Sequence, residues 1–261
     1  MSMKTRIITA FLIIACVIPP LVFGGVLLYA LLSFIIVAGG LELMALREQK
    51  DETWPLLIKP LAIACVFALT FIKKDALLFP LLGIFVLCFL SLPVFTERFH
   101  AKDGFLCIAY ITFFFIIARG FLHIYDRNPL YVWYIIVATY GCDTGAYFCG
   151  RFLGKHKMNP RISPKKTWEG AFGGWLLGAA LSFALAYFLI DTMTLPQILA
   201  ASLILTITGQ IGDLAFSAIK RNFGIKDFSD LLPGHGGVLD RVDSLVFNFI
   251  CFDLILVVLT L

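Results

Sequence analysis

Apolar residues run through this chain in long blocks separated by short polar links. The blocks fall at residues 7–24, 26–46, 56–72, 76–95, 104–124, 130–150, 168–190, 195–219 and 241–261. A helix of about 20 apolar residues matches the thickness of the hydrocarbon core of a bilayer. Strands of about 10 alternating residues, typical of an outer-membrane barrel, are not seen. The pattern predicts an all-α, polytopic integral membrane protein with about nine transmembrane helices.

The first two blocks are separated near Pro19-Pro20 and Gly24-Gly25. The start, MSMKTR followed by an apolar run, has the form of a secretory signal. However, the two prolines stand where small residues would precede a cleavage site, and apolar sequence resumes at Leu21. We therefore interpret the first block as a retained span.

Composition agrees with a membrane protein. The chain is 60% hydrophobic and 15% charged, whereas soluble domains are about 45–50% apolar. The seven cysteines lie mostly inside apolar blocks and form no C-x-x-C pair. We interpret them as small core residues and not as disulfides or zinc ligands.

The basic residues are distributed unevenly between the polar links. With nine spans, Lys73, Lys74, Arg119 and Arg127 fall on one side. The other Lys and Arg residues, including Lys50 in the first polar link, fall on the side of the amino terminus. Because Lys and Arg concentrate in cytoplasmic loops, the amino terminus is expected to be cytoplasmic.

Polar candidates for chemistry gather in the last four blocks. We therefore divide the chain into an N-terminal membrane scaffold, 1–128, and a C-terminal catalytic membrane region, 129–261. On a helix through 195–219, one sector of about 80° collects polar side chains. These are Thr206, Gln210, Asp213, Ser217 and Lys220. Hydrogen bonding between helices would explain Thr and Gln, but a carboxylate and a lysine favour the wall of a wet cavity.

Two aspartates begin the last block. Asp240 and Asp243 are three residues apart, so a helix places them on one face. Stabilisation of a helix start by acidic residues is the alternative. With Asp213 nearby in sequence, we favour a divalent-metal site, because Mg²⁺ binds carboxylate oxygens together with substrate phosphates.

A glycine-rich turn precedes those aspartates. Gly236 and Gly237 follow His235 and allow backbone N–H groups to approach an anion closely. A simple re-entrant turn is the other interpretation.

A second polar region runs from Tyr140 to Gly174. Asp143, Tyr147 and Arg151 are spaced by four, and basic residues follow up to Lys165 and Lys166. The positive-inside rule or attraction to anionic lipid explains such charges equally simply. Ser163 and Thr167 around the two lysines favour a phosphate clamp. The sequence has no basic stretch interleaved with aromatic residues, so it gives no indication of nucleic-acid binding.

Three glycines follow the clamp. Gly170, Gly174 and Gly178 are spaced by four, which predicts a face packed closely on another helix. Together, the two polar regions predict a membrane cavity for phosphate chemistry on a lipid, with a divalent metal holding the phosphates. No Ser-His-Asp or Cys-His order stands out. None is needed, because a phosphate monoester is already anionic and catalysis can rest on positioning and charge neutralisation.

The stretch SAIKRNFGIKDFSDLLPGHGGVLDRVD resembles the signature of bacterial phosphatidate cytidylyltransferases, which are CDP-diacylglycerol synthases. That pattern combines S-x-x-K-R, K-D, P-x-H-G-G and D-R-x-D. The segments DTGAYFCGRFLGKHK and ISPKKTWEG are similar to other marked segments of the family. Phe216 stands where many relatives carry a glutamate.

The resemblance implies transfer of CMP from CTP to phosphatidate, giving CDP-diacylglycerol and pyrophosphate. The lipid phosphate would attack the α-phosphorus in line. The resemblance also implies Mg²⁺, a monovalent cation such as K⁺, and a homodimer in the bacterial cytoplasmic membrane with its active site facing the cytoplasm.

The resemblance also assigns roles to residues. The implied catalytic residues are Asp213, Asp240, Asp243 and Lys220, and the three aspartates are the implied metal ligands. The implied substrate- and phosphate-binding residues are Ser217, Arg221, Lys165, Lys166, Lys226, His235, Gly236, Gly237, Arg241, Asp143 and Asp227. A CTP-dependent lipid or polyprenol kinase is the alternative enzyme, and a transporter or channel is the alternative class.

Overall fold

The structure is a computed structural model that describes residues 3–48 and 53–260. Lys50 of the first polar link lies outside the described residues. Over the described ranges, the chain forms nine α-helices, one 3₁₀ helix and a two-stranded sheet. The predicted all-α membrane class is confirmed.

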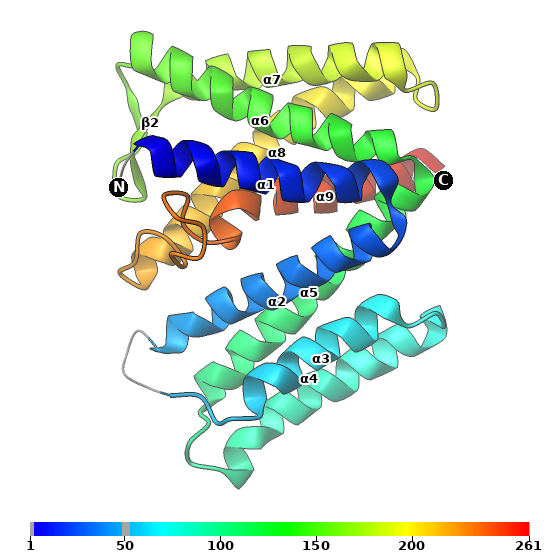
Figure 1. The fold of residues 1–261 in the computed structure, drawn as a ribbon, viewed down its shortest axis with the longest axis vertical. Helices are drawn as coiled ribbons and strands as arrows, with labels where there is room; N and C mark the ends of the chain where they lie inside the picture. Colours follow the sequence, from blue (N-terminus) through cyan, green and yellow to red (C-terminus); the bar gives the residue numbers. More distant parts are fainter. Residues whose placement is uncertain (1–2, 49–52, 261) are drawn as a thin grey trace. The chain divides into compact units, whose positions relative to one another are not determined.

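Each predicted apolar block corresponds to one helix (Figure 1). The bounds are α1 Met3–Phe23, α2 Gly25–Glu48, α3 Ile58–Phe71, α4 Leu78–Phe95, α5 Ala101–Arg127, α6 Pro129–Phe152, α7 Trp168–Leu189, α8 Leu195–Asn222 and α9 Leu239–Thr260, with the 3₁₀ helix η1 at Asp75–Leu77. The structure thus reproduces the predicted blocks to within a few residues.

The break between the first two helices lies at glycine. Pro19 and Pro20 are inside α1, which continues to Phe23. Gly24 and Gly25 have φ of 64° and 56°, a region that glycine enters without the clash of a Cβ. The prediction was therefore right about the glycines and wrong about the prolines.

Six helical segments in the described part of the chain are long and apolar enough to cross a membrane. They are Met3–Phe23, Gly25–Arg47, Asp75–Phe95, Ala101–Arg127, Trp168–Leu189 and Leu195–Asn222. The apolar α3 is shorter, and α6 and α9 carry several polar residues along their length. The protein is therefore a multi-pass membrane protein, and the count of nine crossings stays a prediction.

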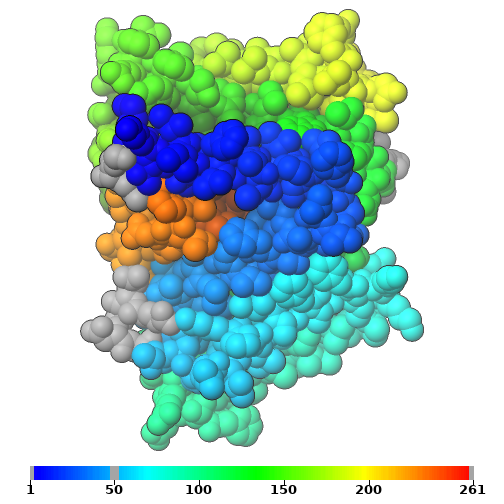
Figure 2. Space-filling view, viewed as in Figure 1, coloured from blue at the N-terminus to red at the C-terminus, as the bar shows by residue number. Residues whose placement is uncertain are grey.

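The residues group into two compact units. Unit 1 comprises Met1–Arg119 and Asp227–Asp240, and unit 2 comprises Gly120–Lys226 and Arg241–Leu261. In unit 1, α1 packs on α2, α2 on α3, and α3 on α4. Apolar side chains of α1, including Phe11 and Phe23, are exposed. Figure 2 shows this helix, in dark blue, on the visible surface. Such exposure is expected of a surface that faces lipid.

Unit 2 is built on the contact between α6 and α7. Gly170, Gly174 and Gly178 are buried, as the spacing predicted. A Cβ at Gly174 would lie 2.6 Å from the carbonyl oxygen of Cys142, and one at Gly178 would lie 2.8 Å from that of Ala138. The close-packing face is confirmed.

A short hairpin joins α6 to α7. Strand β1, Lys157–Asn159, pairs antiparallel with β2, Ser163–Thr167. The sequence predicted only a basic loop here. The two strands pair across a short turn. As a result, Lys165 and Lys166 of β2 lie beside the end of α6.

Candidate active site

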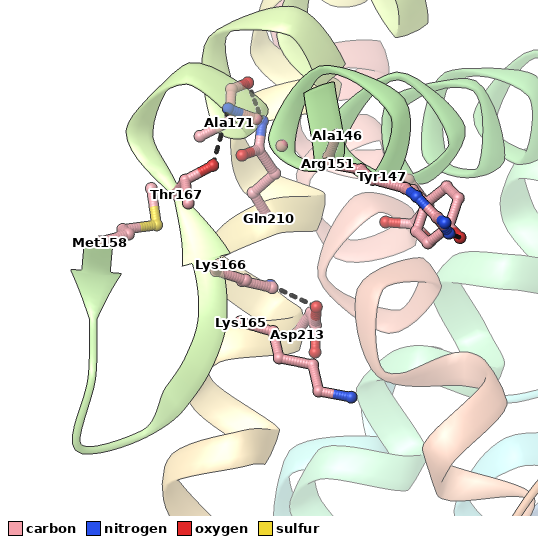
Figure 3. Close-up of a pocket in the computed structure, with 13 residues that line it drawn as sticks. Ala146, Tyr147, Arg151, Met158, Lys165, Lys166, Thr167, Ala171, Gln210 and Asp213 are labelled. Atoms are coloured by element: carbon pink, nitrogen blue, oxygen red, sulfur yellow. Dashed lines mark hydrogen bonds and ion pairs between the residues drawn. The ribbon is translucent and has the colours of Figure 1, made fainter. Parts of the chain in front are cut away.

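Unit 2 contains a cavity of about 500 Å³. The end of α6, the hairpin, the first turn of α7 and the middle of α8 form its walls (Figure 3). Its lining residues are Asp143, Ala146, Tyr147, Gly150, Arg151, Met158, Lys165, Lys166, Thr167, Gly170, Ala171, Gln210 and Asp213. Acidic and basic groups therefore meet in one apolar-walled space, as in other small-molecule sites.

Three carboxylates from three helices lie near one another. Asp143 comes from α6, Asp213 from α8 and Asp243 from α9. The three interact electrostatically as like charges, with Asp213 acting on both of the others. Like charges at short range cost free energy unless cations offset them, so this arrangement favours a bound cation.

Basic side chains supply part of that offset. The ammonium of Lys166 forms an ion pair with Asp213 Oδ2, and Figure 3 shows the two side chains pointing toward each other with Lys165 alongside. Lys220 is buried and acts electrostatically on Asp243. Arg241 acts in the same way on Asp143. The structure thus brings together the predicted acids Asp143, Asp213 and Asp243 with the predicted bases Lys166, Lys220 and Arg241.

The base of the hairpin is tied to α7. Thr167 Oγ1 accepts a hydrogen bond from Gly170 N at 3.2 Å and caps the helix. Glu169 accepts hydrogen bonds from the backbone N–H groups of Lys155 and His156, and its Oε1 lies 2.6 Å from His156 Nδ1. These bonds tie both ends of the hairpin, at residues 155–156 and at Thr167, to the first turn of α7. They therefore fix the position of β2, which carries the two lysines.

The predicted polar stripe of α8 divides into two parts. Gln210 lines the cavity, and its amide donates to the carbonyl of Ala171 at 3.2 Å. Ser217 Oγ donates to Asp213 Oδ1 at 3.4 Å. Thr206 is fully buried outside the cavity lining, and its hydroxyl bonds back to the carbonyl of Ser202 in the same helix. At this position, neither a cavity wall nor a side-chain hydrogen bond to another helix is seen within the described residues.

Two other predicted residues of unit 2 lie near the end of α8. The guanidinium of Arg221 donates to the carbonyls of Ile162 and Ile225, at 3.3 and 2.8 Å. It therefore links α8 to the hairpin turn and to the following linker. Lys226 is exposed.

A hydrogen-bond network one to two helical turns from the carboxylates was not predicted from the sequence. Asn248 of α9 is fully buried. Its amide nitrogen donates to Thr139 Oγ1 on α6 at 2.7 Å, and its amide oxygen accepts from Thr208 Oγ1 on α8 at 2.5 Å. The network therefore joins the three helices that carry Asp143, Asp213 and Asp243. A polar residue in the apolar run of α9 was the only available signal.

The remaining predicted residues belong to unit 1. Asp227, His235, Gly236, Gly237 and Asp240 lie in the segment from Asp227 to Asp240. Asp240 Oδ2 accepts hydrogen bonds from Phe228 N at 2.8 Å and Gly237 N at 2.9 Å. Gly236 has a φ of 82°, so glycine is required for this turn.

The carboxylates of the cavity bear on whether Mg²⁺ can bind. Among the described residues, no group of three or more His, Cys, Asp or Glu is arranged to hold a metal ion. Mg²⁺ commonly uses one or two carboxylates and completes its shell with substrate phosphates and water. Asp143, Asp213 and Asp243 lie close enough to interact as like charges, so one or two of them can serve as ligands, and these residues fit that mode of binding.

Comparison with known proteins identifies the family. Residues 4–259 match the model of the cytidylyltransferase family. The chain is 33% identical to the phosphatidate cytidylyltransferase of Staphylococcus epidermidis over 261 residues, covering 98% of this chain and 99% of the relative. The corresponding proteins of Staphylococcus aureus (strain COL) and Staphylococcus saprophyticus are 32% and 34% identical with the same coverage. The resemblance seen in the sequence is thus confirmed, and the chain belongs to the cytidylyltransferase family.

Proposed function

We propose that this protein is a phosphatidate cytidylyltransferase, which transfers the CMP moiety of CTP to phosphatidate and releases pyrophosphate. The observation that carries the proposal is the cavity of unit 2, where Lys165 and Lys166 face Asp143 and Asp213. Two anionic substrates require cations to approach each other, and the family relatives are named for this reaction.

In the proposed reaction, Lys165 and Lys166 bind substrate phosphates and reduce their mutual repulsion. Lys166 exchanges its partner Asp213 for a phosphate when substrate enters. The lipid phosphate is already anionic at neutral pH, so it attacks the α-phosphorus of CTP in line without a general base. Positioning and charge neutralisation supply the catalysis.

Asp213, Asp240 and Asp243 are the proposed ligands of Mg²⁺, and a monovalent cation such as K⁺ is proposed to share the acidic centre. The metal would supply positive charge at the reacting phosphates. Lys220 partly balances the charge of Asp243, and Arg241 partly balances that of Asp143. The proposed substrate contacts of Ser217, Arg221 and the Asp227–Asp240 segment follow from the family signature.

The decisive experiment incubates the purified protein in detergent with CTP, phosphatidate and MgCl₂. We expect equimolar pyrophosphate and CDP-diacylglycerol, both abolished by EDTA and restored by excess Mg²⁺. CDP and a phosphorylated alcohol would instead identify a lipid kinase. Substrate flux in proteoliposomes without CTP turnover would identify a transporter.

We also propose that the protein is a homodimer in the bacterial cytoplasmic membrane, with the cavity open to the cytoplasm. The basic residues of the hairpin support this orientation, since Lys and Arg concentrate on that side. Chemical cross-linking in native membranes, followed by electrophoresis, would test the dimer. A single band at the mass of the monomer under saturating cross-linker would contradict it.

A further inference from the structure

Glu42 is a buried carboxylate in the apolar helix α2. Its side chain lies among residues of unit 1 and is 5% exposed. An acidic residue inside an apolar span is costly and persists where it has partners or a function. The proposed site draws no residue from α2, so Glu42 needs a separate explanation.

Both oxygens of Glu42 bind the loop that carries the glycine-rich turn. Oε1 accepts from Ser229 Oγ at 2.6 Å and from Val238 N at 2.8 Å. Oε2 accepts from Leu239 N at 2.8 Å. The partners lie nearly 200 positions away in the sequence, so α2 fastens both ends of a loop far along the chain.

These contacts also cap α9. The first N–H groups of a helix have no partner within the helix. At the start of α9, Val238 and Leu239 donate theirs to Glu42. A carboxylate at a helix N-terminus is further stabilised by the helix dipole. Glu42 therefore serves as a cap supplied by another helix.

The fit around the carboxylate is close. A Cβ at Gly237 would lie 2.6 Å from Glu42 Oε1, so any side chain at this position would displace either the Glu42 carboxylate or the loop. Asp240 binds the neighbouring positions of the same loop, accepting hydrogen bonds from Phe228 N and Gly237 N. The two carboxylates together determine the path of the loop.

We infer that Glu42 is a positioning residue, which holds the Asp227–Asp240 loop and the start of α9 in the conformation that the reaction requires. The inference rests on the proposed function. Glu42 acts through Gly237 and Asp240 in the loop. It also acts through α9, which carries Arg241 and Asp243 within its first turns. Glu42 itself contacts no substrate.

The test compares Glu42→Ala and Glu42→Gln with the control Tyr110→Phe. The control removes another buried hydrogen bond to α2, from Tyr110 Oη to the Ile36 carbonyl at 3.0 Å. The measurements are kcat for pyrophosphate release and hydrogen–deuterium exchange of peptides covering residues 227–240, with the rest of unit 1 as reference.

We expect Glu42→Ala to lower kcat about 10- to 100-fold, because two buried backbone donors and the part-buried Ser229 hydroxyl lose their acceptor. Exchange should rise in the loop and not elsewhere in unit 1. Glu42→Gln should be intermediate, since its amide oxygen replaces only one carboxylate oxygen. Tyr110→Phe should retain the wild-type kcat and loop exchange.

Wild-type kcat in Glu42→Ala, with or without faster loop exchange, would overturn the inference. Increased exchange throughout unit 1 would also overturn it, by showing a general structural role. If Glu42→Ala does not fold, Glu42→Gln and Ser229→Ala provide the same comparison. If the wild-type protein releases no pyrophosphate, the proposed function fails, and loop exchange alone decides whether Glu42 holds the loop.

Discussion

At the scale of single residues, Asp213 interacts with groups from several elements around the cavity. It pairs with Lys166, accepts a hydrogen bond from Ser217, and interacts as a like charge with Asp143 and Asp243. In the proposed reaction, this carboxylate balances a lysine in the resting protein and would balance a metal ion when phosphates are bound. Its charge, more than its shape, should therefore matter.

We expect Asp213→Asn, which keeps the shape and removes the charge, to lower kcat about 100-fold. Pyrophosphate release from the purified variant measures the effect. Asp191→Asn is the control, because Asp191 is an exposed carboxylate of unit 2 outside the cavity lining. Activity of Asp213→Asn within twofold of the control would remove Asp213 from the catalytic residues.

At the scale of helices, Asn248 links α6, α8 and α9 one to two turns from the three carboxylates. Thr139 precedes Asp143 by one turn, and Thr208 precedes Asp213 by slightly more. A bond that spans three helices limits how far they can slide or separate. The spacing of the carboxylates therefore depends on a residue that carries no charge.

Removing the Asn248 amide should destabilise unit 2. We expect Asn248→Ala to lower the free energy of unfolding by about 1–3 kcal/mol, because the hydrogen bonds of the amide to Thr139 and Thr208 are lost and a buried space is left. A double-mutant cycle with Thr208→Val should show a coupling of about 0.5–3 kcal/mol. Denaturant unfolding in detergent measures both. Additive effects of the two substitutions would contradict the proposed link.

Close packing of α6 on α7 makes a separate prediction. In Gly178→Leu, the new Cβ would meet backbone atoms of Ala138 and Cys142 at 2.8 Å. Backbone cannot move aside without separating the helices, so we expect a loss of at least about 1–3 kcal/mol of stability. Gly83→Leu is the control, because its Cβ position has no atom within 4 Å apart from the backbone of its own helix and its chain neighbours. Equal thermal stability of the two variants would refute the packing argument.

At the scale of the whole molecule, the charge distribution predicts orientation in the membrane. Lys74→Cys, between α3 and α4, should react with a membrane-impermeant maleimide in intact cells. Lys157→Cys, in the hairpin, should react only after permeabilisation, because the basic side is expected to be cytoplasmic. Labelling of the unmodified protein gives the background from its native cysteines. The reverse pattern would invert the proposed topology.

The sequence by itself determined the helices, the membrane class and the family. Apolar blocks predict helices because, inside a bilayer, a single segment can pair its backbone N–H and C=O groups only within a helix. The family signature is recognisable because its residues lie close together in the sequence. The tertiary structure alone decided which distant groups meet. It placed Asp143 beside Asp213 and Asp243, joined three helices through Asn248, and brought Glu42 to a loop nearly 200 positions away. These contacts come from packing between helices, which local periodicity does not encode.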